Sequence, residues 1–70
     1  MSLPKNYLDV QYEAGQGCYR VWIFRNGQPW AQCCSQNLFT IVVLARRLNC
    51  VIRADNNLKE PLKARGARIV

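Results

Sequence analysis

The sequence predicts a small α+β domain, in which an antiparallel sheet packs on one helix in the order β-β-β-α-β, followed by a short C-terminal helical turn. Three observations support this class: an alternating segment near the start, an Asn-Gly pair between two β-rich runs, and a longer apolar stretch with polar caps. With 70 residues, the chain is long enough for one domain only. We therefore expect residues 1–70 to form a single unit, with residues 1–6 flexible or partly left over from expression.

The first strand is predicted over residues 7–14, where apolar and polar side chains alternate as on a half-buried strand. The run "CYRVWIF" over residues 18–24 is rich in β-branched and aromatic residues and predicts a second strand. Asn26-Gly27 follows it and is typical of a two-residue turn, in which both residues need a positive φ. Such a turn would pair Phe24 with Pro29 and Ile23 with Trp30.

Residues 35–50, "SQNLFTIVVLARRLNC", allow either a buried strand or a helix. We prefer a helix because the stretch is long, because Ser35 or Asn37 can cap its start, and because Asn49 can end it in the left-handed conformation. Its inner face would then hold Leu38, Ile41, Val42, Ala45 and Leu48.

The rest of the chain predicts shorter elements. "VIRA" over residues 51–54 is typical of a strand. A helical turn is expected to start near Pro61 and to stop at Gly66, because proline suits a first turn and glycine a helix end. Residues 67–70 could add a last strand.

The chain has four cysteines and no histidine: Cys18, Cys33, Cys34 and Cys50. Their spacing lacks the paired ligands of a structural zinc site, so we expect no metal and no cofactor. Cys33 and Cys34 are adjacent, and adjacent residues on a strand point to opposite faces. We therefore interpret the cysteines as small core residues, not as metal ligands, a disulfide or redox thiols.

Composition argues against catalysis and against a membrane protein. The four carboxylates are scattered, and no Ser-His or Cys-His pair can exist, so no enzyme activity is expected. The longest apolar run, residues 41–45, is far too short to span a bilayer. No signal peptide is apparent, so we expect a cytoplasmic protein that does not bind membranes.

Positive charge is concentrated in the last third of the chain. Residues 46–70 hold seven basic and two acidic residues, against three and two in residues 1–45. An arginine-rich surface suits phosphate, so the sequence predicts a non-catalytic nucleic-acid-binding protein with a regulatory role; the alternative is a small adaptor or inhibitor that docks on an acidic protein. The candidate contacts are Arg46, Arg47, Arg53, Lys63, Arg65 and Arg68.

Apolar residues outnumber the positions that a chain this small can bury. Both faces of the predicted hairpin are largely apolar, but one helix can cover only one face. Exposed apolar patches usually mark interfaces, so we expect a homodimer. Trp22 and Trp30 are the expected anchors, because aromatic side chains concentrate binding energy at interfaces.

Overall fold

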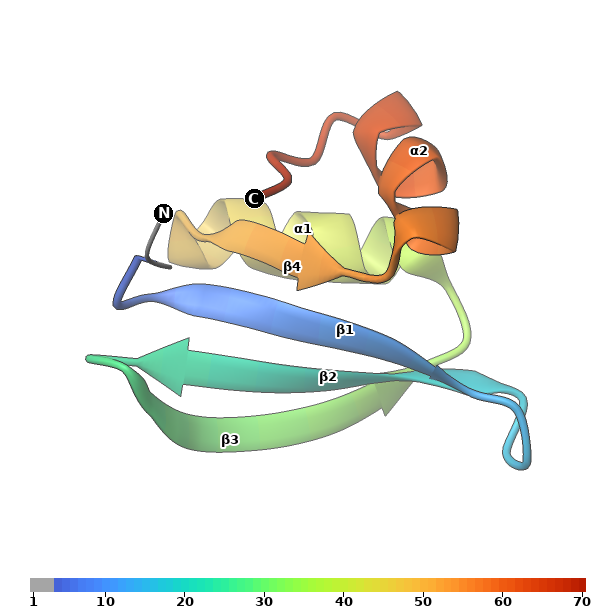
Figure 1. The fold of residues 1–70 in the computed structure, drawn as a ribbon, viewed down its shortest axis with the longest axis horizontal. Helices are drawn as coiled ribbons and strands as arrows, with labels where there is room; N and C mark the ends of the chain where they lie inside the picture. The colour runs from blue at the N-terminus through green and yellow to red at the C-terminus, as the bar shows by residue number, and fades with distance from the viewer. Residues whose placement is uncertain (1–3) are drawn as a thin grey trace.

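Four strands and two helices make up residues 4–70, the part of the chain that the computed structural model describes, and they confirm the α+β class (Figure 1). In chain order the elements are β1 (Tyr7–Glu13), β2 (Cys18–Arg25), β3 (Gln28–Ser35), α1 (Leu38–Leu48), β4 (Val51–Ala54) and α2 (Asn56–Ala64).

The sheet has the strand order β3-β2-β1-β4 and is mixed, not purely antiparallel as the sequence analysis expected. β2 is antiparallel to both β1 and β3, whereas β4 is parallel to β1. The crossover through α1 explains the difference. A helix that returns over a sheet brings the next strand in parallel to the previous one, and β3 already runs parallel to β1.

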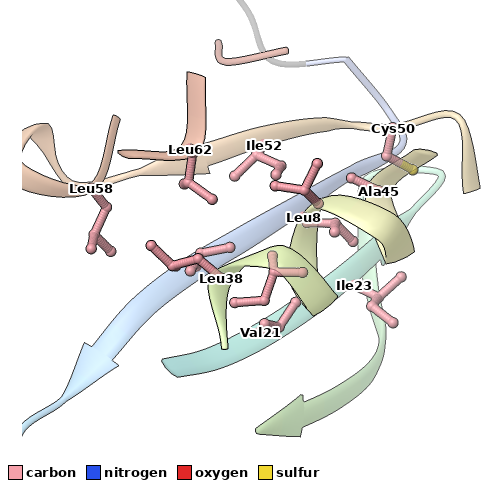
Figure 2. Packing of buried hydrophobic residues seen from close by; sticks show 12 residues of the cluster. Leu8, Val21, Ile23, Leu38, Ala45, Cys50, Ile52, Leu58 and Leu62 are labelled. Atoms are coloured by element: carbon pink, nitrogen blue, oxygen red, sulfur yellow. The ribbon is translucent and has the colours of Figure 1, made fainter. Parts of the chain in front are cut away.

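The hydrophobic core lies between one face of the sheet and the two helices (Figure 2). Alternation along β1 sends Leu8 and Val10 into this core, where both are fully buried, and Ile52 of β4 is equally inaccessible. Leu58 and Leu62 of α2 join the same cluster. The second helix therefore covers the sheet face that α1 covers, and no helix of residues 4–70 lies on the other face.

The hairpin between β2 and β3 forms as predicted at its turn and differs farther along. Asn26 and Gly27 both have positive φ, and Phe24 pairs with Pro29. A β-bulge then shifts the register, so that Ile23 pairs with Ala31 and Trp30 is the extra residue. The predicted pairing of Ile23 with Trp30 is therefore wrong. A one-residue slip exchanges the faces of a strand, and here it turns the small Ala31 toward the core in place of a bulky tryptophan.

Helix α1 has the caps that the sequence predicts, and the strand alternative for this stretch is excluded. The Asn37 side chain accepts a hydrogen bond of 2.8 Å from the backbone N–H of Phe39. Asn49 ends the helix in the left-handed conformation, with φ 54° and ψ 45°. The predicted inner face is buried except for Leu48, which remains 37% exposed.

Helix α2 begins at Asn56, well before the predicted start near Pro61, and has Pro61 in its interior. Asp55 occupies the N-cap position, and Gly66, with φ 90°, follows the helix as predicted. The chain then returns to β4, where Ile69 forms an isolated parallel bridge with Ile52. Neither helix is long and apolar enough to cross a membrane, within the residues that the structure describes.

Two cysteines are buried and two are exposed, and of the buried two Cys50 belongs to the hydrophobic core cluster whereas Cys18 lies on the other face of the sheet. Cys18 and Cys50 are buried as expected, whereas Cys33 and Cys34 are exposed, which corrects the interpretation of all four as core residues. The reason is their position on β3, an edge strand that the helices only partly cover and in which every residue is exposed or half-buried.

The N-terminal segment lies against the hairpin turn. The backbone N–H of Gly27 donates to the carbonyl of Lys5 at 2.9 Å, and that of Asn26 donates to Oδ1 of Asn6 at 3.1 Å. Residues 1–6 are expected to be flexible, and residues 1–3 of this segment lie outside the described residues.

Candidate nucleic-acid interface

Topology gathers basic residues from both halves of the chain at one end of the sheet. β1 and β4 are parallel, so they start at the same end, and the antiparallel β2 finishes there. α1 also ends at this point, because Cys50 follows it directly into β4. The C-terminal segment returns over α1 (Figure 1). We call this the basic end, and its cations are Lys5, Arg25, Arg46, Arg47 and Arg68.

A hollow of about 270 Å³ lies between the last turn of α1 and the C-terminal segment. Arg46 and Arg68 both line it, together with Asn49 and Gly66. Nη2 of Arg68 donates to Oδ1 of Asn49 at 2.9 Å, which fixes one guanidinium at the rim. Gly66 leaves room for the other, since a Cβ atom at this position would collide with Nη2 of Arg46. The hollow is thus lined by two arginines and by no carboxylate.

A second, smaller hollow adjoins the first at Cys50, which lines both. Its volume is about 50 Å³, and its walls include Arg25 and the partly exposed Leu48. The guanidinium carbon of Arg25 lies 5.2 Å from the ring centroid of Trp30, in a cation–π contact. Trp30 is 62% exposed, so much of its indole ring remains accessible to solvent. An exposed aromatic ring therefore contacts the arginine that lines the second hollow.

Part of this positive charge has a structural role. The carboxyl end of a helix carries a partial negative charge, and Arg46 and Arg47 lie in the last turn of α1, where cations offset it. Among the described residues, none of the cations at the basic end forms an ion pair. Within residues 4–70 the structure shows one ion pair, Arg20 with Glu13 at 2.8 Å, and it lies at the opposite end of the sheet. That hydrogen-bonded carboxylate raises the pKa of Arg20.

The structure separates the six basic residues that the sequence predicts as contacts. It brings Arg46 and Arg68 together in the first hollow. Arg47 is exposed on α1 but lines neither hollow, and Lys63 and Arg65 lie at the end of α2. Nη1 of Arg65 donates to the carbonyl of Pro61 at 2.8 Å, so this side chain serves the end of its own helix.

Arg53 is the outlier of the six. It points away from the helices on β4, where Asp9 of β1 lies beside it in the register. It therefore belongs to the uncovered side of the sheet. We call this side the open face, and its main charged and aromatic residues are Asp9, Glu13, Arg20, Trp22, Phe24 and Arg53.

Arg25 is not among the contacts predicted from the sequence, because these were all drawn from the basic last third of the chain. Arg25 belongs to the nearly neutral half of the sequence, yet it lines the hollow that adjoins Arg46 and Arg68 through Cys50. The signal that could have found it is topological. Once a helical crossover makes β4 parallel to β1, the end of β2 must lie at the same end of the sheet as the start of β4.

The two predicted interface tryptophans lie apart. Trp22 is half-buried on the open face, where it pairs with Asp9 and Gln32 on the neighbouring strands. Trp30 contacts Arg25 at the basic end. Near Trp22, the rings of Tyr7 and Phe24 stack with centroids 4.6 Å apart and planes 5° from parallel. The open face therefore carries aromatic surface without Trp30.

No protein-family model, no curated protein and no solved structure matches the chain. Functional inference therefore depends on the geometry of these surfaces.

Proposed function

We propose that this chain is a small, non-catalytic nucleic-acid-binding protein that contacts phosphate through its basic end. The observation that carries the proposal is the pair of adjoining hollows, lined by Arg46, Arg68 and Arg25 and by no carboxylate. The planar guanidinium fork matches phosphate oxygens in two parallel hydrogen bonds. Arg68 is already oriented by Asn49, so it loses little conformational freedom on binding.

Trp30 favours a single strand over a duplex as the ligand. Its exposed ring contacts Arg25, and an unpaired base of any identity can stack on an aromatic side chain. A duplex keeps its bases stacked inside and would leave this ring unused. The contacts are therefore expected to be tolerant of sequence, since phosphates position a ligand and do not specify bases.

Fluorescence anisotropy with labelled oligonucleotides tests this function. The protein should bind a single strand more tightly than a duplex of the same length, and affinity should fall steeply with salt. Each neutralised phosphate contributes a slope of about −0.7 on a single strand in log affinity against log salt. The double variant Arg46→Ala/Arg68→Ala should therefore flatten the single-strand slope by about 1.4.

Arg53→Ala is the matched control for that variant, because it removes an arginine from the open face and from neither hollow. It should leave the slope nearly unchanged. Absence of binding to any DNA or RNA at low salt would overturn the proposal. An equal loss in the control and the double variant would place the contact elsewhere.

A second candidate is an acidic protein partner, and Leu48 is the observation that favours it. This leucine is 37% exposed and lines the second hollow beside Arg25. A phosphate backbone gains little from an aliphatic contact, whereas an acidic peptide with an apolar anchor would use it. Leu48→Ser should weaken an acidic protein ligand and spare an oligonucleotide, so this variant distinguishes the two.

We also propose that two copies associate through the open face. Trp22 and Phe24 provide apolar area there, and no helix of residues 4–70 covers it. Its charges balance, with Asp9 and Glu13 against Arg20 and Arg53, so a second copy of a strongly basic chain can approach without net repulsion at this surface. Sedimentation should show a dimer at micromolar concentration that Trp22→Ser dissociates and Trp30→Ser does not. A monomer in the wild type would contradict this assembly.

A further inference from the structure

The end of the sheet opposite the basic end carries two cysteines on neighbouring strands. Cys18 opens β2, and Cys34 lies one residue before the end of β3. In the register Arg20 pairs with Cys34, so Cys18 is the diagonal neighbour of Cys34 on the same face of the sheet. Both cysteines line one hollow of about 320 Å³ together with Gln16, Ser35 and Gln36.

The two thiols interact with each other and with an arginine. Burial raises the pKa of Cys18, and a hydrogen bond with the Cys34 side chain raises it further. Arg20 pairs with Cys34 in the register, and its positive charge partly opposes the rise in the pKa of Cys18. The Arg20 guanidinium donates to Glu13 at 2.8 Å and to Gln32 at 2.8 Å, which holds it in place between the strands.

The two cysteines differ in access, and this difference suggests separate tasks. Cys34 is exposed and can meet a reagent from solution, whereas Cys18 is only 7% exposed and can meet little besides Cys34. Cys33 provides an internal comparison. It is exposed like Cys34, but it pairs with Val21 and so lies on the other face of the sheet.

We propose that Cys18 and Cys34 form a redox-sensitive thiol pair, which small disulfides such as oxidised glutathione convert to an intrachain disulfide. The Cys34 thiolate attacks one sulfur of the reagent, breaks its S–S bond and releases one glutathione thiol. The Cys18 thiolate then attacks the Cys34 sulfur of this mixed disulfide and releases the second glutathione. The reagent is reduced to two thiols, and the protein loses two thiol hydrogens and gains one S–S bond.

Geometry predicts that this disulfide is readily reduced. Diagonal neighbours across an antiparallel pair have Cα atoms about 7–8 Å apart, and a disulfide needs at most about 6.8 Å. The strands must therefore approach slightly. Both cysteines lie beside strand ends, next to the turn before Cys18 and the loop after Ser35, where such a shift costs least. Strained disulfides have more oxidising potentials and are the labile ones.

Peptide mapping of the full chain tests the pair. The reduced protein is treated with oxidised glutathione at low protein concentration, digested without reductant and analysed by mass spectrometry. The wild type and Cys33→Ser should form no disulfide between chains and should yield an intrachain crosslinked peptide pair that dithiothreitol separates. Cys34→Ser should yield no intrachain crosslink. Cys18→Ser should stop at the mixed disulfide and retain one glutathione.

The variants distinguish a reactive pair from incidental thiols. A crosslink in Cys34→Ser that involves Cys33, or a wild type that keeps glutathione and never closes, would overturn the proposal. Cys34 is exposed, so its serine variant is expected to fold, and circular dichroism checks this. If Cys18→Ser fails to fold, the comparison of Cys33→Ser with Cys34→Ser still decides the outcome.

Discussion

The two ends of the sheet are built from the same strands and have opposite chemistry. At the basic end, cations from three separate segments meet around two hollows without a carboxylate among the lining residues. At the other end, β1 finishes in Glu13, β4 leads into Asp55, and a thiol pair lies between β2 and β3. Parallel β1 and β4 produce this polarity, because they start among cations and finish among acids.

The distance between the ends makes them electrostatically independent. β1 has seven residues, and a strand rises about 3.3 Å per residue, so the ends lie about 23 Å apart. Exposed charges are largely screened beyond about 8 Å at physiological salt. Changes at one end should therefore leave the chemistry of the other unaltered, unless they unfold the chain.

The largest expected effect comes from Ile52→Ala, which should disrupt both ends together. Ile52 is fully buried, and its backbone binds the C-terminal segment through Arg68 and Val70. The change should lower the free energy of unfolding by about 3 kcal/mol, a large share for a chain this small. Urea denaturation measures it. A loss below about 1 kcal/mol would mean that this strand is not central to the core.

Trp30→Ala should weaken the basic end alone. Loss of one stacked base should cost about 2 kcal/mol of affinity for a single strand and should leave duplex binding nearly unchanged. Anisotropy titrations measure both, and the rate of Cys18–Cys34 closure is the control from the other end. Equal losses on single strand and duplex would contradict a stacking role for this ring.

Gly66→Ala should have a smaller effect, directed at the first hollow. Gly66 has φ 90°, and an added Cβ would collide with the Arg46 guanidinium. The strain should destabilise the fold by about 1–2 kcal/mol, and displacement of Arg46 should reduce the salt slope of binding. Gly15→Ala is the matched control, since its Cβ would meet nothing within 4 Å. Unchanged binding would show that Arg46 makes no phosphate contact.

The smallest effect is expected at the thiol end and depends on pH. Burial raises the pKa of Cys18 above its ordinary value. The unfolded chain therefore loses this proton first, and the free energy of unfolding should decline as pH rises past that value. Cys18→Ser should reduce the decline, whereas Cys33→Ser should retain it. Denaturation curves from pH 7 to pH 10 measure the difference.

Local signals predicted the elements well. The Asn37 side chain caps the start of α1, and Asn49 ends the helix in the left-handed conformation. Asn26-Gly27 forms the predicted hairpin turn. These features depend on a few neighbouring residues, so a single sequence contains the needed information. The start of α2 was missed because Pro61 was taken as its first turn, although tertiary burial of Leu58 supports an earlier start.

Long-range features escaped the sequence analysis for a physical reason. The bulge at Trp30 has no compositional mark, and it arises because Ala31 and not Trp30 fits toward the core. Because of this one-residue shift, Cys34 and not Cys33 lies on the same face of the sheet as Cys18. The register predicted from the turn therefore hid the proximity of Cys34 to Cys18. One of the three arginines at the candidate site was hidden likewise, since the place of Arg25 depends on the direction of β4.

The bulge also has a consequence for the solubility of the chain. β3 is an outer strand whose residues, Gln28–Ser35, include no charged side chain that would repel another strand. Regular uncharged edges template aggregation, because their free N–H and C=O groups can extend the sheet into another molecule. Pro29 removes one donor from this edge, and the extra residue at Trp30 kinks the strand and breaks its regular hydrogen-bonding repeat. The bulge and Pro29 should therefore hinder fibril formation at an edge strand that has no lysine or glutamate to repel another strand.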